Sequence, residues 1–382
     1  MTDKRLLKKK IISSLESQGF NLDDNRIVVN SSREKARDIQ RFSRLEKIKK
    51  HCKFLLAQNG EVKKFLLNGA ELNPSKINIE LRTVESGSYL EKIYRWWNFI
   101  WWSIPFERAY GRQMRFVLWD TYHDKPFGLI GLQSPSLRIQ IRDSYLHIKP
   151  EERDWWVNMS MSAQRVGAFP PYNRLLGGKL VAMALSTKEI RDTYYYKYHD
   201  MRTWIKDRNL PANLLFITTT GAFGKSSIYN RVKYYEDKLI ELIGYTKGSG
   251  AFHIPDELYQ EIINFLGKEG INTGRGYGYG PSRKRQLLSI GFQKLEMPNF
   301  EYHGIKRAFY LIPHVYNLHN VIMQKEEPEF KHYSIEDLCD FWMKRWALKR
   351  AEIKKDWLTF KADKFWEQVQ KQLEDLSCSA KP

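Results

Sequence analysis

The chain has 382 residues, of which 42% are hydrophobic, and its 63 Lys and Arg against 44 Asp and Glu give a formal net charge of +19. This hydrophobic content excludes an intrinsically disordered protein, and the length favours two or three domains. No apolar run reaches the roughly 18–20 residues that cross a bilayer, so we expect no membrane partner.

The positive charge points to a polyanionic partner, because it raises the rate of encounter with polyanions. We expect nucleic acid, with DNA favoured, rather than a membrane surface, which is usually met by a clean basic amphipathic helix. The basic N-terminus lacks the apolar segment of a secretory signal. The three cysteines are widely spaced and are expected to be reduced thiols, so a cytoplasmic location is predicted.

Residues 1–105 are predicted to form a basic helical N-terminal region. Helices are expected over Lys4–Ser17, after the capping segment Asn30–Ser32 to about Ala57, and after Gly87 and Ser88. The last helix carries Trp pairs at a five-residue step, at positions 96, 97, 101 and 102, which cannot share one helical face. Part of this cluster is therefore expected to be buried on two sides.

Residues 106–328 are predicted to form an α/β core domain with a central mixed sheet. The expected elements are a hairpin over Arg112–Trp119 and Phe127–Gln133, a strand over Trp155–Val166, a helix over Leu180–Tyr198, a strand over Leu214–Thr219, helices over Ser226–Ile243 and Glu257–Leu266, and a strand over Phe309–Leu311. This order predicts an α+β arrangement with at least one parallel crossover. Residues 329–382 are predicted to be a basic, Trp-rich helical tail.

Two glycine-containing loops are candidate anion sites. Gly221–Ser227 departs from a Walker A loop, since Thr219 occupies the position of the first glycine, but Gly224, Lys225 and Ser226 can still hold a phosphate at a helix start. The second loop contributes the candidates Asn173, Gly177, Gly178 and Lys179. The alternatives are a polar strand-to-helix turn with a capping serine for the first loop and a tight, closely packed turn for the second.

The segment Asn272–Arg285 has the composition most typical of nucleic-acid binding. Its glycines alternate with tyrosines, which can stack on bases, and with cations, which can neutralise phosphates. The alternative interpretation is a mobile surface loop. The candidate binding residues are Arg275, Tyr277, Tyr279, Arg283, Lys284 and Arg285.

No catalytic residue and no metal site can be selected. The sequence has no zinc, calcium or His-Glu-x-x-His spacing. The carboxylates nearest the expected hairpin and strand are interpreted as turn or cap residues; they are Asp120, Asp124, Asp143 and Asp154.

Several ordered blocks between about residues 85 and 325 resemble the DruA family of the Druantia anti-phage defence systems. The blocks are Gly111–Val117, Pro126–Gly131, Arg153–Asn158, Asn173–Leu180, Thr218–Ser227 and Tyr229–Val232. The resemblance implies an antiviral role in the bacterial cytoplasm, beside other Druantia components that include a helicase-like protein. It implies no settled activity and no catalytic residues.

The order of elements is also similar to the N-acetyltransferase (GNAT) fold, in which a glycine loop holds acetyl-CoA. Gly177 and Gly178 depart from the glycine spacing of that loop, so the cofactor stays unknown. Three functions follow: a nucleic-acid-binding defence component, an enzyme that cuts or modifies nucleic acid or transfers an acyl group, and a protein–protein adaptor using the Trp-rich helices.

Overall fold

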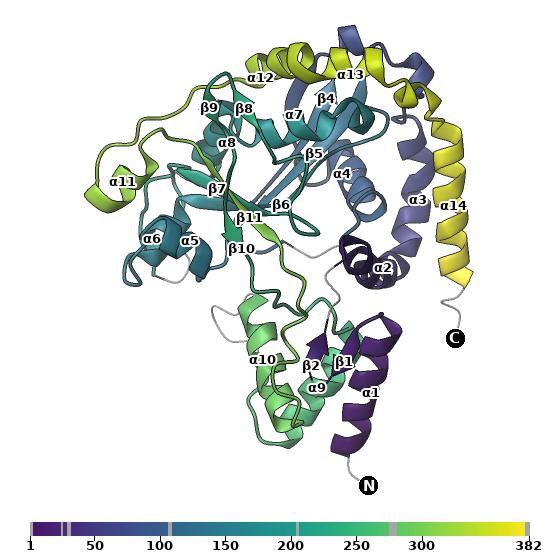
Figure 1. Cartoon of the computed structure of the whole chain (residues 1–382), viewed down its shortest axis with the longest axis vertical. Helices are drawn as coiled ribbons and strands as arrows, with labels where there is room; N and C mark the ends of the chain where they lie inside the picture. The colour runs from purple at the N-terminus through teal and green to yellow at the C-terminus, as the bar shows by residue number, and fades with distance from the viewer. Residues whose placement is uncertain are drawn as a thin grey trace.

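The computed structural model describes residues 3–23, 26–28, 32–105, 109–203, 206–274 and 281–378. Figure 1 shows a sheet enclosed by helices, with a smaller helical lobe below it that carries the N-terminus. Within the described residues, no helix combines the length and the apolar character needed to cross a membrane.

A seven-stranded mixed sheet forms the centre of the molecule, in the order β10-β11-β7-β6-β5-β4-β3. Its strands are β3 (Ile79–Thr83), β4 (Gln113–Asp120), β5 (Lys125–Gln133), β6 (Ser160–Ala168), β7 (Phe216–Thr220), β10 (Glu241–Tyr245) and β11 (Ala308–Pro313). Only the β6–β7 pair is parallel among these neighbours. The predicted mixed sheet, the β4–β5 hairpin and the parallel crossover are therefore confirmed.

Helices cover both faces of this sheet, and three more, α1, α9 and α10, lie in the lower lobe. The helices of the described structure are α1 (Asp3–Ser17), α2 (Arg33–Lys50), α3 (Cys52–Lys63), α4 (Tyr89–Ile100), α5 (Gln140–Tyr145), α6 (Arg153–Asn158), α7 (Gly177–Ala184), α8 (Lys188–Tyr198), α9 (Asp256–Lys268), α10 (Pro281–Lys294), α11 (Leu318–Gln324), α12 (Ile335–Trp342), α13 (Leu348–Ile353) and α14 (Ala362–Cys378). Short 3-10 turns are η1 (Gly69–Glu71), η2 (Pro74–Lys76), η3 (Tyr172–Leu175) and η5 (Asp356–Thr359), and η4 (Met343–Ala347) is a π-helical turn.

Alternation along β4 assigns its side chains to two cores. Phe116 and Leu118 pack with α7, α8 and α12 on one face, whereas Val117 and Trp119 pack with α3, α4 and α14 on the other. This follows from the period of two along a strand. Both faces are buried, which explains why β4 and β5 are almost continuously apolar.

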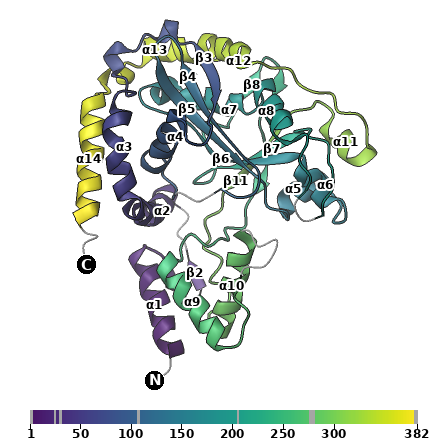
Figure 2. The ribbon, with the colours of Figure 1, turned by 180° about the vertical axis from the view of Figure 1, so that it is seen from behind.

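The Trp-rich helix α4 begins after Ser88 as predicted, and the Ser88 hydroxyl caps it by accepting a hydrogen bond from the backbone N–H of Glu91. Trp96 and Trp97 are fully buried, and the Trp97 ring stacks on Phe169 with centroids 4.0 Å apart. The two-sided burial expected of this cluster is confirmed for these two residues. Figures 1 and 2 both show α14 beside α3, so the last helix completes the wall around this core.

The lower lobe consists of α1, the β1–β2 hairpin, α9 and α10, with β1 at Asn21–Asp23 and β2 at Arg26–Val28. A third core joins these elements to the first half of α2 through Ala36 and Ile39. Gly291 lets α10 approach α9 closely, since a Cβ there would lie 2.6 Å from the Ile262 side chain. The division of the chain at residues 105 and 328 stays a prediction.

Two predicted elements are wrong. Ser226–Ile243 is not a helix: it forms turns, the β8–β9 hairpin (Lys233–Tyr234 and Asp237–Lys238) and the start of β10. Distant contacts decide this, because the Asp237 carboxylate accepts hydrogen bonds from Lys331 and Tyr333. The first part of the expected strand Trp155–Val166 is instead the end of α6, and β6 begins at Ser160.

Two long predicted helices are each broken into two. The helix expected from Ser32 to Ala57 breaks at His51, whose backbone is non-helical, with φ of −110° and ψ of 12°. The helix expected over Leu180–Tyr198 breaks between α7 and α8 at Leu185, Ser186 and Thr187. Ser186 and Thr187 are completely buried there, and the Thr187 hydroxyl donates to the carbonyl of Ala184.

Candidate nucleic-acid interface

Helix α2 presents a long row of cations to solvent. Ser32 caps α2 by accepting a hydrogen bond from the N–H of Lys35. The buried side chains of α2 pack into the cores on either side of the point where α2 meets the lower lobe. The rest of the surface of α2 faces solvent, as expected for an amphipathic helix with 3.6 residues per turn. The exposed cations on this surface are Arg33, Lys35, Arg37, Arg41 and Lys50.

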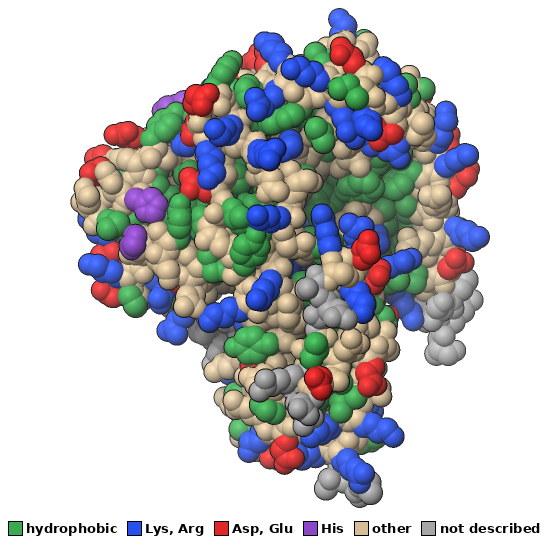
Figure 3. Space-filling view, viewed as in Figure 1, with side chains coloured by type: hydrophobic (Ala, Val, Ile, Leu, Met, Phe, Trp, Pro, Cys, Tyr) green, Lys and Arg blue, Asp and Glu red, His purple; other side chains and the backbone are tan. Residues whose placement is uncertain are grey.

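Three lysines converge on one carboxylate where α2 meets the lower lobe. The ammonium groups of Lys47, Lys50 and Lys284 lie 2.6, 3.2 and 3.5 Å from the carboxylate oxygens of Asp256. Burial alone would raise the pKa of Asp256, but the hydrogen bond and charge of Lys47, with the charges of Lys284 and Lys50, hold it well below its usual range. Glu257 adds a second carboxylate, 4.0 Å from the Lys50 ammonium, so three ammonium groups face two carboxylates and the junction keeps a net positive charge. Figure 3 shows Lys and Arg side chains, with a few Asp and Glu side chains among them, where the body meets the lower lobe.

The predicted binding residues Arg283, Lys284 and Arg285 lie on the first turns of α10 rather than in a loop. Their polar groups reach different neighbours. The Arg283 guanidinium donates to the carbonyl of Asn272 at 2.6 Å, and Arg285 donates to the Ser249 hydroxyl at 2.8 Å. Lys284 also lies over the Tyr259 ring, 4.7 Å from its centroid.

Three of the predicted residues, Arg275, Tyr277 and Tyr279, fall outside the described residues. The described part of the predicted loop ends at Gly274, whose N–H donates to the Asn272 side chain. The structure therefore brings Lys284 together with α2 and leaves the stacking role of the tyrosines a prediction.

The two predicted anion loops lie side by side. The Lys179 ammonium donates to the carbonyls of Ser227 and Asn230, at 3.1 and 2.8 Å. A Cβ on Gly178 would lie 2.8 Å from the Ile228 side chain, so only glycine permits this approach. Sequence order separates these loops by about fifty residues, and the parallel β6–β7 pairing brings them together.

Neither loop has the open phosphate cradle that the sequence suggested. A Cβ on Gly177 would meet the Tyr172 carbonyl oxygen at 2.7 Å and the Phe127 ring at 2.8 Å. No helix starts at Ser226, whose backbone N–H instead donates to the Tyr310 hydroxyl at 3.0 Å. The strand–loop–helix geometry expected for Gly224, Lys225 and Ser226 is thus wrong, although Gly224 takes a positive φ of 80° and Lys225 is exposed.

A second basic cluster surrounds Lys179. Its ammonium and the guanidinium of Arg345 each lie 5.3 Å from the centroid of the Trp346 ring, which is a cation–π geometry. Burial lowers the pKa of Lys179, and the charges of Arg345 and Arg231 lower it further. Trp346 and Arg345 belong to the π-helical turn η4, and sequence inspection gave no signal that they would meet the second loop.

The four carboxylates interpreted as turn or cap residues have internal partners. Asp120 is completely buried and accepts hydrogen bonds from the Tyr172 hydroxyl at 2.9 Å and from His123 at 2.6 Å. Asp124 accepts from the Trp119 indole. Asp143 pairs with Arg142 and Arg153, and Asp154 pairs with Lys206 and Arg208.

Within the described residues, no group of three or more His, Cys, Asp or Glu side chains is placed to hold a metal ion. Several cations of the described surface lie over aromatic rings, as Arg37 does over Phe223 and Lys284 over Tyr259. Such a surface can neutralise phosphates and offer faces for bases.

Residues 30–324 match the family model of the Druantia protein DruA. A curated Druantia protein DruA from Escherichia coli (strain UMEA 4076-1) is 31% identical over 367 residues, which cover 93% of this chain and 90% of the relative. No solved structure gives a significant match.

Proposed function

The chain belongs to the DruA family and is a component of a Druantia anti-phage defence system, in which we propose that it binds nucleic acid, DNA in particular, through the basic junction of α2 and α10. The observation that carries this proposal is the gathering of Lys47, Lys50 and Lys284 around the carboxylate of Asp256, with Glu257 as one further carboxylate 4.0 Å from Lys50. An excess of cations at one place is costly for a fold unless a polyanion offsets their repulsion.

The exposed cations of α2 extend this junction along the helix. Arg37 lies over the Phe223 ring at 5.7 Å, next to Gly224 and Lys225, whereas Lys50 lies at the Asp256 end. An 18-residue helix is about 27 Å long, so its cations can follow several successive phosphates of a strand. The predicted anion-loop residue Lys225 thus belongs to the same proposed surface as Lys284.

Binding measured against salt concentration tests the proposal. Wild-type protein is titrated with single- and double-stranded DNA between 50 and 300 mM salt, and log Kd is expected to rise linearly with log salt concentration. Replacing Arg37, Arg41 and Lys50 with Gln removes three exposed cations and is expected to flatten the slope for duplex by about two to three.

A charge-matched control separates a specific surface from net charge. The exposed residues Lys76, Lys354 and Lys355 lie by η2 and after α13, at the far end of the molecule from the lower lobe. Replacing these three with Gln is expected to leave the slope close to that of the wild type. Equal losses in both triple variants, or no binding at 50 mM salt, would refute an interface at the α2–α10 junction.

The other two functions have less support from the structure. An adaptor built on the Trp-rich helices needs exposed rings, and Trp96, Trp97 and Trp342 are fully buried, which leaves only partly exposed tryptophans at 101, 102, 346 and 366 among the described residues of these segments. An N-acetyltransferase-like cofactor site needs space beside Gly177 and Gly178, and packing closes both glycines. Saturating acetyl-CoA is accordingly expected to leave the melting temperature unchanged, whereas a rise would restore the transferase alternative.

Association with other Druantia components, including the helicase-like one, belongs to the same proposal. The assay is co-expression followed by size-exclusion chromatography with and without DNA. Co-migration that requires DNA would support recruitment through the bound strand.

A further inference from the structure

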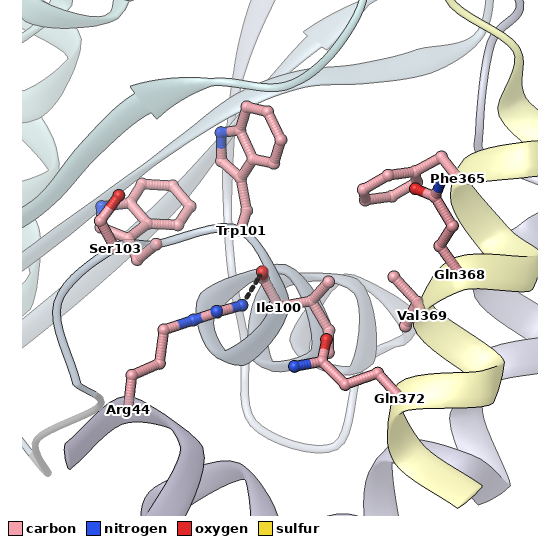
Figure 4. A pocket seen from close by; sticks show the side chains of 9 residues that line it. Arg44, Ile100, Trp101, Ser103, Phe365, Gln368, Val369 and Gln372 are labelled. Atoms are coloured by element: carbon pink, nitrogen blue, oxygen red, sulfur yellow. Dashed lines mark hydrogen bonds between the residues drawn. The ribbon is translucent and has the colours of Figure 1, made fainter. Parts of the chain in front are cut away.

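A cleft lies between the end of α4 and the C-terminal helix α14. Its larger part has a volume of about 710 Å³ and its smaller part about 260 Å³, and both parts share Trp101, Phe365 and Gln368. The larger volume falls within the roughly 300–1,000 Å³ that is typical of small-molecule sites. Figure 3 shows a hollow lined by apolar side chains in this region, and Figure 4 shows Trp101 and Phe365 projecting into it from opposite sides.

The aromatic walls are held in place by contacts outside the cleft. The Trp101 indole N–H donates to the carbonyl of Ala168 at 3.0 Å, which fixes the orientation of the ring. Phe365 stacks on Trp97 with centroids 5.7 Å apart and lies 6.3 Å from Trp101 in an edge-to-face arrangement. Both Trp101 and Phe365 remain partly exposed, so a flat aromatic ligand would find preformed faces.

The charge around the cleft has one sign. Arg174, Lys361 and Lys364 line the larger part and Arg44 lines the smaller one, and no lining residue in the described structure is acidic. Lys361, directly before α14, and Lys364, on its first turn, are exposed at the mouth. An anionic group would therefore sit at the mouth while an uncharged ring goes inside.

Two buried polar atoms at the walls have no hydrogen-bond partner: the side-chain oxygen of Asn173 and the Nε of Arg44. Arg44 donates through its terminal nitrogen to the carbonyl of Ile100, the bond drawn in Figure 4. Buried polar groups are almost always satisfied, so these two atoms have hydrogen-bonding capacity that a polar ligand in the cleft could use after a small side-chain movement. Asn173 was predicted as an anion-loop residue, and the structure places it at this cleft instead.

We propose that this cleft binds one nucleotide, with its base against Trp101 and Phe365 and its phosphate at Lys361 and Lys364. Asn173, Gln368 and Gln372 supply amide groups for the edges of the base. The nucleotide has two sources with the same chemistry, a free mononucleotide or an unstacked residue of a bound strand. For the second source, the inference rests on the proposed function.

Calorimetric titration of the full chain with AMP tests the cleft without any polymer. Adenosine lacks the phosphate and ribose 5-phosphate lacks the base, and each is expected to bind about tenfold more weakly than AMP or worse. Gln368→Trp fills the cleft from an exposed position without removing a core side chain, and it is expected to weaken AMP binding by about tenfold or more. Glu367→Trp adds the same ring at the adjacent exposed position, outside the lining, and is expected to bind AMP like the wild type.

Lys361→Gln combined with Lys364→Gln provides a second variant that keeps the cleft open. It is expected to weaken AMP binding while leaving adenosine binding unchanged. Failure of AMP to bind the wild type at millimolar concentration, or equal affinity in the Gln368→Trp variant, would overturn the proposal. Loss of a Druantia partner from Gln368→Trp without any AMP binding by the wild type would likewise overturn it, in favour of a protein occupant.

Photo-crosslinking with an oligonucleotide that contains 5-iodouracil distinguishes the two sources. Crosslinks on peptides that carry Trp101 or Phe365 show that a base of the strand enters the cleft. AMP binding with crosslinks elsewhere supports a free nucleotide. If the oligonucleotide does not bind at low salt, the proposed function fails. The AMP titration then still shows whether the cleft binds a nucleotide.

Discussion

Replacing Asp256 with Asn should have opposite effects on stability and on DNA binding. The carboxylate lies within 2.6 to 3.5 Å of three ammonium groups and begins α9, where a negative charge also favours the helix N-terminus. Its side chain is 43% exposed, so solvent screening reduces each pair to about 0.2–1 kcal/mol. We expect the substitution to lower the free energy of unfolding by about 1–2 kcal/mol at low salt and by less at 1 M salt.

The pH dependence carries a definite sign. The pKa of Asp256 is lowered in the folded state, so its contribution is present above the pKa of about 3.9 expected for an unfolded Asp. This contribution is lost as the pH falls toward the lower pKa of the folded state. The difference in unfolding free energy between wild type and Asp256→Asn, measured by urea titration, is therefore expected to be constant from pH 7 to 5 and to shrink below pH 4.

DNA binding should change in the other direction. The variant removes the carboxylate that Lys47, Lys50 and Lys284 share, while Lys50 keeps Glu257 at 4.0 Å, so its affinity should rise and its salt slope should steepen by up to about one. Glu261→Gln is the matched control, because Glu261 lies on the same helix with the same 43% side-chain exposure but pairs with Lys10 alone. The reasoning is refuted if Asp256→Asn binds DNA more weakly than wild type, or if the control has equal effects on stability and slope.

Two further predictions concern stability. Gly177→Ala should lower the free energy of unfolding by about 1–3 kcal/mol, because the added Cβ would press on the Tyr172 carbonyl and the Phe127 ring. Gly267→Ala, at a helix position with open space around it, should instead raise the free energy of unfolding by about 0.4–1 kcal/mol. Urea unfolding of both variants tests this, and equal effects would contradict the packing argument. Burial lowers the pKa of His314 to about 3, so stability should fall as the pH drops from about 6.5 toward 3, with this residue contributing a slope of up to about 1.4 kcal/mol per pH unit. His314→Gln should make that acid loss shallower, and an unchanged slope would show that the histidine does not carry it.

Local signals in the sequence predicted the elements that depend on local chemistry. The capping segment that ends at Ser32, the Gly87-Ser88 boundary and two β-prone runs joined by a polar turn placed α2, α4 and the β4–β5 hairpin. The failure at Ser226–Ile243 has a distant cause, since Asp237 is held by Lys331, which lies 94 residues further along the chain. No periodicity within a short window carries that information.

For the candidate site too, the sequence predicted the local features but not the contacts between distant segments. Composition singled out Lys284 and Lys225 as cations, but their common relation to α2 required the tertiary structure. Asn173 was selected for a phosphate loop by its spacing to glycines, and it lines a cleft whose other wall comes from α14. A site assembled from segments almost two hundred residues apart leaves no spacing pattern to read.

The packing of α14 on α3 sets an order of events during synthesis. The Cys52 thiol donates to the carbonyl of Leu373, and the Trp366 indole donates to the carbonyl of Asn59, so α3 meets its partner only when the last few dozen residues have left the ribosome. Until α14 is in place, the hydrophobic core that contains Trp96 and Trp97 is not fully covered. A chain that lacks α14 would therefore expose part of this aromatic core, and exposed apolar surface of this kind makes incomplete chains prone to aggregate.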